Sequence, residues 1–123
     1  MGVKQDYIMR MIENMVRMIV QLLLGKDTLD YELPDKKEAY TDKDFLFERL
    51  IHMADDGLIN EAENLLFEKL DNKDSEYLEM ALCFYMYIND KEADFLEKHN
   101  YSKEEIKDGI AMLGKEYGIS GLV

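Results

Sequence analysis

Apolar residues recur with helical spacing from residue 4 to residue 24, in the string KQDYIMRMIENMVRMIVQLLL. At 100° per residue, the apolar face is about twice as wide as the ~100° stripe of an ordinary surface helix. Gly25 follows and is typical of the residue that ends a helix. We therefore expect a long N-terminal helix that needs cover on more than one side. The polar positions fall in one sector: Arg10, Glu13, Asn14, Arg17 and Gln21.

Residues 27–40 have no helical period and are predicted to form an extended connector. Leu29, Tyr31 and Leu33 alternate with polar residues, and Pro34 disfavours a helical conformation of the residue before it. Loops of this length are uncommon in compact domains unless they are pinned or functional. The alternation favours docking of the connector by its apolar side.

After the connector, apolar periodicity predicts five more helices, over residues 42–56, 61–70, 75–88, 92–98 and 103–117. Thr41 with Asp44, and Ser102 with Glu105, have the spacing of a capping box. Asn60 is predicted to cap the helix that begins at the next residue. The predicted fold class is all-α with five or six helices. The expected inward-facing residues are Phe45, Leu46, Leu50, Ile51, Met53, Ala62, Leu65, Leu66, Leu70, Leu78, Leu82, Cys83, Tyr85, Met86, Ile106, Ile110 and Leu113.

The string ADDGLINEAENLLF, residues 54–67, resembles the helical hairpin of a tetratricopeptide repeat. Gly57 stands at the turn between the two helices, and the small Ala62 stands where they approach. Glu92-Ala93 with Leu96 is a weaker echo of the same pattern, without the glycine. The resemblance implies three parts: an N-terminal amphipathic helix over 1–26, as an arm or a core helix; a connector over 27–40; and a tetratricopeptide-like helical domain over 41–123.

The whole chain resembles a family of small, acidic bacterial proteins of unknown function. The strings that carry this resemblance are QDYIMRMIENM, LDYELP and GLINEAENLLFEKLD, which begin at residues 5, 29 and 57. The resemblance implies an all-helical, tetratricopeptide-like fold. It implies no activity, substrate or catalytic residue.

Composition narrows the function classes. The chain has 123 residues, 47% of them hydrophobic, which fits one folded domain and excludes a disordered chain. The formal net charge is −12. Residues 1–26 carry four basic and two acidic side chains, a net +2, so the remainder carries −14. An acidic body repels the phosphate backbone, and we expect no nucleic-acid partner.

The cellular compartment is inferred from three negative features. A single cysteine cannot form an internal disulfide, which favours a reducing compartment. No signal peptide is evident, and no run reaches the ~18 apolar residues that a membrane-spanning helix needs. We therefore expect a cytoplasmic protein.

Candidate catalytic and metal-binding residues are few, and each fits a structural role better. His52 with Asp55 and Asp56 has metal-ligand spacing, but three ligands from one short helix make a poor site. His52 and His99 both fit a cation near a helix C-terminus. Cys83 fits a small, inert core residue. We expect no catalytic residue, no metal and no cofactor, and the protein is predicted not to be an enzyme.

Five of the nine methionines lie within the first eighteen residues, a composition typical of adaptable binding surfaces. We expect a non-catalytic protein-interaction module that forms a dimer through the N-terminal helix. Replacing Met11 and Met15 by Asp should then abolish the oligomer and not the fold. The expected interaction residues are Tyr7, Ile8, Met11, Ile12, Met15, Met18, Ile19 and Leu22.

Two further binding modes follow from the sequence. Tyr77, Tyr85 and Tyr87 are predicted to line a groove for a peptide, and the acidic surroundings favour a basic partner. The alternative for the N-terminal helix is peripheral association with a membrane surface, which the −14 body disfavours. No small-molecule substrate is indicated.

Overall fold

The computed structural model describes residues 3–122, with side chains from residue 6 onward, and this part of the chain is all-α. Six α-helices and two short helical turns follow one another, and no strand occurs among the described residues. The fold class predicted from the sequence is confirmed. The elements are α1 (Val3–Ile19), η1 (Val20–Leu24), η2 (Lys37–Ala39), α2 (Asp42–Asp55), α3 (Ile59–Glu68), α4 (Ser75–Asn89), α5 (Ala93–Lys98) and α6 (Lys103–Glu116).

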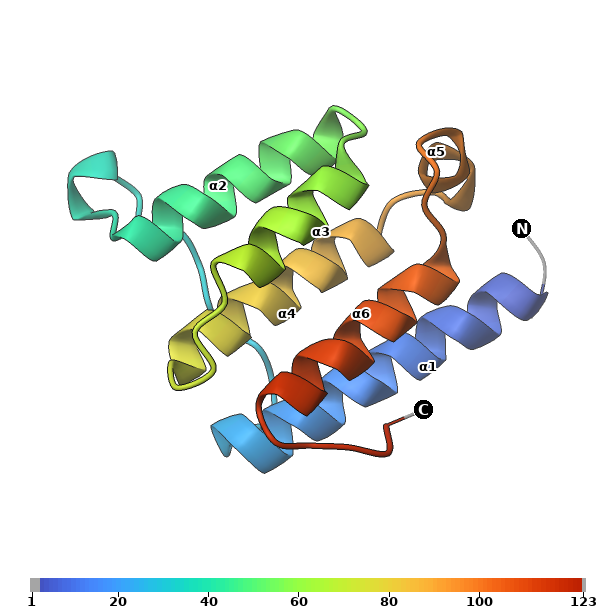
Figure 1. The fold of residues 1–123 in the computed structure, drawn as a ribbon, viewed down its shortest axis with the longest axis horizontal. Coiled ribbons are helices and arrows are strands. Elements are labelled where there is room, and N and C mark those ends of the chain that lie inside the picture. Colours follow the sequence, from blue (N-terminus) through green and yellow to red (C-terminus); the bar gives the residue numbers. More distant parts are fainter. Residues whose placement is uncertain (1–2, 123) are drawn as a thin grey trace.

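Helix α1 is a core helix and not a projecting arm. It continues into the single π-helical turn η1, which ends at Gly25 with φ of 66°. Figure 1 shows α1 lying along α6 at one side of the molecule, with α4 next to α6. One face of the helix is buried there: Ile8, Ile12, Met15, Val16, Ile19 and Val20.

Helix α4 lies at the centre of the fold, between the α2–α3 pair and the α1–α6 pair (Figure 1). Ten of its fifteen residues are buried, among them Phe84 and Tyr85 at 0% exposure. A helix covered on opposite sides has no polar face to give its sequence an amphipathic period. This placement explains the apolar string MALCFYMYI, residues 80–88.

The predicted helix boundaries hold except at one end. Thr41 and Asp44 form the predicted capping box, and the Ser102 hydroxyl accepts from the Glu105 amide. The prediction for Asn60 is wrong, because α3 begins at Ile59, two residues earlier than predicted, with Leu58 at the cap position. The Asn60 side chain instead donates to the carbonyl oxygen of residue 100 at 3.0 Å, and so ties α3 to the loop after α5.

One predicted core residue is not in the core. Phe45 is 47% exposed and packs edge-on against Tyr40, with ring centroids 4.9 Å apart. It lies on the first turn of α2 and faces the connector, while Leu50 and Ala54 further along the helix are fully buried.

The connector is pinned to the helices at two points. The Tyr31 hydroxyl donates to Asp44 at 2.6 Å, and the Asp30 backbone amide donates to Glu79 on α4 at 2.8 Å. Lys26 also pairs with Glu79, at 2.7 Å. An extended segment of this length therefore stays ordered through side-chain hydrogen bonds and the packing of Tyr31 on Phe47.

Candidate interaction surface on the N-terminal helix

The outward side of α1 carries large apolar side chains that nothing in the described chain covers. Tyr7, Met18 and Leu22 are 64%, 48% and 65% exposed, and Met11 between them is half-buried. At 100° per residue these four positions lie within about 60° of one another. We call Tyr7, Met11, Met18 and Leu22 the α1 strip. They include three of the seven large exposed hydrophobic residues of the described chain.

A hollow of about 540 Å³ lies beside the α1 strip. Its far wall is Leu122, because the segment after α6 turns back along α1 (Figure 1). The chain turns back at Gly118, with φ of 99°, and Leu122 then packs over Gly114, where an added Cβ would stand 2.7 Å from its side chain. The hollow is lined by Tyr7, Arg10, Met11, Asn14, Met15, Met18 and Leu122.

The opposite edge of the exposed face is charged. Asp6, Arg10, Glu13 and Arg17 are all exposed and alternate in sign along the helix. We call these four residues the α1 charged flank. The ion pairs found between residues 6 and 122 involve none of them, and the Arg17 guanidinium donates only to the Asn14 amide oxygen, at 3.2 Å. The flank is therefore available to charges of opposite sign on a partner.

Half of the predicted interaction residues are not available to a partner. Ile8, Ile12, Met15 and Ile19 are at most 5% exposed and pack in the core with α4 and α6. The wide apolar face that the sequence indicates is thus mostly core, and the α1 strip is its uncovered edge. The expectation that Asp at Met15 spares the fold is wrong, because a buried charge without a partner destabilises the core.

The predicted tyrosine groove does not exist. Tyr77 and Tyr85 are at most 5% exposed, and their hydroxyls donate to the Leu66 carbonyl at 2.6 Å and to Glu63 at 2.5 Å. Tyr87 alone reaches the surface, at 37% exposure, where its hydroxyl donates to Asp55. The prediction assumed a helix with one free face, whereas α4 is covered on both sides.

The histidines and the cysteine take structural positions. His52 is exposed in the last turn of α2. His99 is half-buried, with its ring against Phe95 and its Nδ1 2.9 Å from the Phe95 carbonyl oxygen. Burial raises the pKa of the Cys83 thiol to about 11, so the thiolate is scarce at neutral pH. Among residues 6–122, no group of three or more potential ligands is placed to hold a metal ion.

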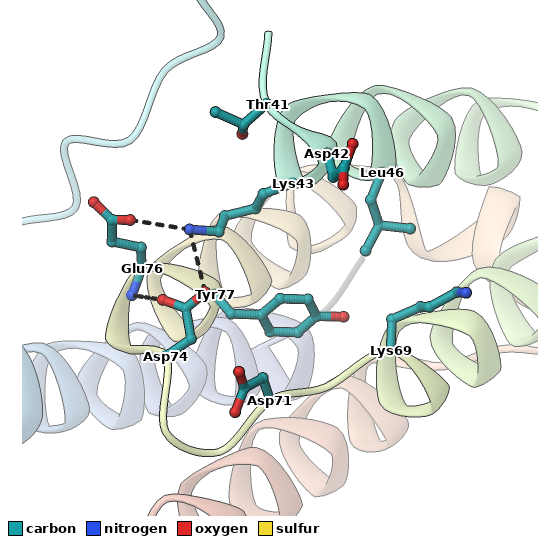
Figure 2. Close-up of a pocket in the computed structure, with 9 residues that line it drawn as sticks. All are labelled: Thr41, Asp42, Lys43, Leu46, Lys69, Asp71, Asp74, Glu76 and Tyr77. Atoms are coloured by element: carbon teal, nitrogen blue, oxygen red, sulfur yellow. Dashed lines mark hydrogen bonds and ion pairs between the residues drawn. The ribbon is translucent and has the colours of Figure 1, made fainter.

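Another hollow, of about 730 Å³, lies where the N-termini of α2 and α4 meet the end of α3 (Figure 2). Lys43 crosses it and pairs with Asp74 at 3.4 Å and Glu76 at 3.2 Å. The Tyr77 ring forms its floor, and its hydroxyl is already bonded to Leu66. Lys43 thus joins the starts of α2 and α4, and its charge is already paired with two carboxylates.

The contact among Glu63, Tyr85 and Gly109 was not predicted from the sequence. Glu63, for which the sequence analysis gives no role, is partly buried and accepts a hydrogen bond from the buried Tyr85. The signal was Gly109, whose missing side chain leaves room for both groups. A glycine in a helix interior has a cost, and that cost points to close packing.

These features define an all-α protein with an uncovered apolar helix edge. Residues 2–118 match the family of unknown function DUF6483, and the chain belongs to that family. The resemblance to an all-helical family of unknown function is confirmed to that extent. No curated protein and no solved structure shows a significant match to the chain. Within residues 3–122, no helix has both the length and the hydropathy to cross a membrane.

Proposed function

We propose that this protein is a self-associating interaction module, a homodimer in which the α1 strip packs against the same strip of a second copy. The observation that carries the proposal is the exposure of Tyr7, Met18 and Leu22, between 48% and 65%, on one side of one helix. Removing large apolar side chains from water is the main driving force of association. Two copies related by a two-fold axis can bury identical strips against each other.

The α1 charged flank favours a second copy as the occupant. Consider two antiparallel α1 helices whose two-fold axis passes between residues 11 and 12. Asp6 then lies opposite Arg17 of the second copy, and Arg10 lies opposite Glu13. Two antiparallel helices place equivalent flanks side by side, so both attractive pairs form at one register. Met11 stands next to the axis, with Tyr7 and Met18 on either side of it.

Light scattering on the full chain tests the proposal. The wild-type protein should have the mass of a dimer at micromolar concentration, and Met18→Glu should have the mass of a monomer with unchanged helicity. The reason is that the buried apolar part of an interface tolerates no unpaired charge. The matched control is Met112→Glu, because Met112 is 54% exposed on α6, away from the α1 strip. A monomeric wild type, or a dimer that survives Met18→Glu, contradicts the proposal.

The membrane surface is the competing occupant, and the charges disfavour it. The α1 charged flank sums to zero, and the acidic body would be repelled by anionic lipid. Flotation with phosphatidylglycerol vesicles distinguishes the two. If the wild type floats as a monomer and Met18→Glu does not, the strip binds lipid and the dimer proposal fails.

We also propose that α2 and α3 form a hairpin of the tetratricopeptide type. Gly57, with φ of 86°, joins the two helices, and Ala62 is fully buried where they approach. Both features support the resemblance between this turn and that of a tetratricopeptide unit. The hairpin would serve as scaffold, with α1 as the contact element.

A further inference from the structure

A second open groove lies between α3 and α6, away from the α1 strip. It has a volume of about 480 Å³. Its three ionisable lining residues are all carboxylates, and the half-buried Phe67 and the exposed Met112 supply apolar walls. We call it the α3–α6 groove; it is lined by Glu63, Asn64, Phe67, Glu105, Asp108, Gly109 and Met112.

Glu63 is the base of the groove. One of its carboxylate oxygens accepts the Tyr85 hydroxyl at 2.5 Å, and the ion pairs found between residues 6 and 122 include none to it. Gly109 on α6 makes the arrangement possible, because an added Cβ would overlap both the Tyr85 hydroxyl and the Glu63 carboxylate. The protein thus holds a negative charge against its core without a cation.

The Tyr101 hydroxyl is a second sign of a missing partner. Tyr101 is 2% exposed, and its hydroxyl makes no hydrogen bond of standard geometry within the described chain. It lies near the same carboxylates: burial raises the pKa of Tyr101, and its interactions with Glu63, Glu105 and Asp108 raise it further. Leaving a buried hydroxyl unpaired costs about 1–3 kcal/mol, so a group that engages it would be bound favourably.

The potential around Glu63 also favours a cation. Burial raises the pKa of Glu63, the Tyr85 hydrogen bond partly opposes this, and the neighbouring charges of Glu105 and Asp108 raise it again. A bound positive group would reverse this balance and hold Glu63 ionised. The cation must be supplied by a ligand, because no basic residue lines the groove.

We propose that the α3–α6 groove binds a basic peptide through one lysine side chain, whose ammonium group pairs with Glu63 and whose methylene stem lies against Phe67 and Met112. An ammonium group fits better than a planar guanidinium, because Tyr85 already occupies one Glu63 oxygen and prevents bidentate pairing. A cation that holds Glu63 ionised also makes Glu63 a stronger acceptor for the buried Tyr101 hydroxyl beside it. Glu105 and Asp108 are exposed at the rim of the groove and can pair with basic residues next to the lysine in the peptide. A free amine has no such neighbouring residues and would bind more weakly.

The test is a titration of the ¹⁵N-labelled full chain with the peptide acetyl-Gly-Lys-Lys-Gly-amide, observed at the Gly109 amide. Saturable shifts are expected for this peptide and not for its norleucine counterpart, which has the stem without the charge. Glu63→Gln keeps an acceptor for Tyr85 and should weaken binding at least tenfold. Glu61→Gln, an exposed site on the same helix outside the groove, should leave binding unchanged.

Each remaining outcome contradicts the proposal in a defined way. Equal binding of the norleucine peptide, or unchanged binding by Glu63→Gln, excludes recognition of the ammonium group. Binding of n-butylammonium as tight as that of the peptide makes the groove an amine site and overturns the peptide assignment. If Glu63→Gln fails to fold, the doubly substituted rim variant Glu105→Gln with Asp108→Asn still has to weaken peptide binding several-fold. The monomeric Met18→Glu variant should bind the peptide normally, which separates this groove from the dimer interface.

Discussion

Individual residues show where this sequence accepts local strain for a close contact. Gly57 has φ of 86°, and an added Cβ there would overlap the ring of His99. The histidine is held by Phe95 and by the loop after α5, so it cannot move aside freely. From sequence, Gly57 was recognised as a turn residue, but His99 could not be predicted as its cover. The two are 42 positions apart, and no periodicity connects them.

This contact predicts unequal effects of alanine at two glycines with similar backbone conformation. Gly25, with φ of 66°, has open space around it, so Gly25→Ala should cost only the backbone strain of about 1 kcal/mol. Gly57→Ala adds the clash with His99 and should lower the free energy of unfolding by about 2–4 kcal/mol in urea titrations. His99→Ala in the Gly57→Ala background should recover part of the loss. Equal losses at the two glycines would exclude the clash.

At the scale of elements, the positions of the helices were predictable and the burial of the central helix was not. Periodicity located α1 with η1, α2, α4 and α6 within one or two residues. It could not show that α4 is covered on both sides, so its tyrosines look available in the sequence. Nothing in the sequence indicated that α3 begins at Ile59. Leu58 occupies the N-cap position and has no polar side chain, which is the usual sequence signal of a helix start.

Asp44 joins two elements, and its charge should make their junction sensitive to acid. Burial alone would raise the pKa of Asp44, but hydrogen bonds from the Thr41 amide and hydroxyl and from the Tyr31 hydroxyl hold this pKa below its usual value. A carboxyl with a lowered pKa stabilises the fold above its unfolded-state value of about 4. This contribution is lost as the pH falls through the folded-state pKa.

Asp44→Asn therefore should lower the free energy of unfolding by about 1–2 kcal/mol at pH 7, through a weakened capping box and connector contact. The deficit relative to wild type should shrink at pH 3, where the wild-type carboxyl begins to protonate. Urea unfolding at the two pH values measures it. Asp42→Asn, in the same helical turn but exposed, is the control for charge near the helix N-terminus. A deficit that is the same at both pH values would show that the Asp44 charge has no part in it.

At the scale of the whole molecule, the charge segregation seen in the sequence has two consequences. The acidic body carries the α3–α6 groove, and the N-terminal helix carries a flank of balanced charge beside the α1 strip. The sequence indicated α1 as the contact element but could not separate its buried residues from its exposed ones. That division depends on which sectors α4 and α6 cover, and only the packing of distant helices decides it.

The proposed antiparallel pairing predicts how reversing single charges on α1 changes the dimer Kd. The net charge of the protein alone does not predict this result. Arg10→Glu places the new glutamate of each copy opposite Glu13 of the other copy, so two repulsive pairs form. Each exchange of attraction for repulsion costs about 0.7 kcal/mol, so the dimer Kd should rise about tenfold. Adding Glu13→Arg restores opposite charges at both positions and should return the Kd to near the wild-type value. Sedimentation equilibrium at low salt measures all three proteins.

Arg49→Glu is the matched control for the change in net charge, because Arg49 is exposed on α2 and lies away from α1. If it raises the Kd as much as Arg10→Glu does, general repulsion between acidic bodies explains the effect. If Arg10→Glu weakens the dimer and the double variant does not recover, the strips meet at another register. Recovery in the double variant would require residues 10 and 13 to face each other across the axis. An interaction between the two residues within one helix would change the stability of the monomer and not the Kd of the dimer. That result would assign the α1 charged flank its role as the device that sets the register of an otherwise unspecific apolar contact.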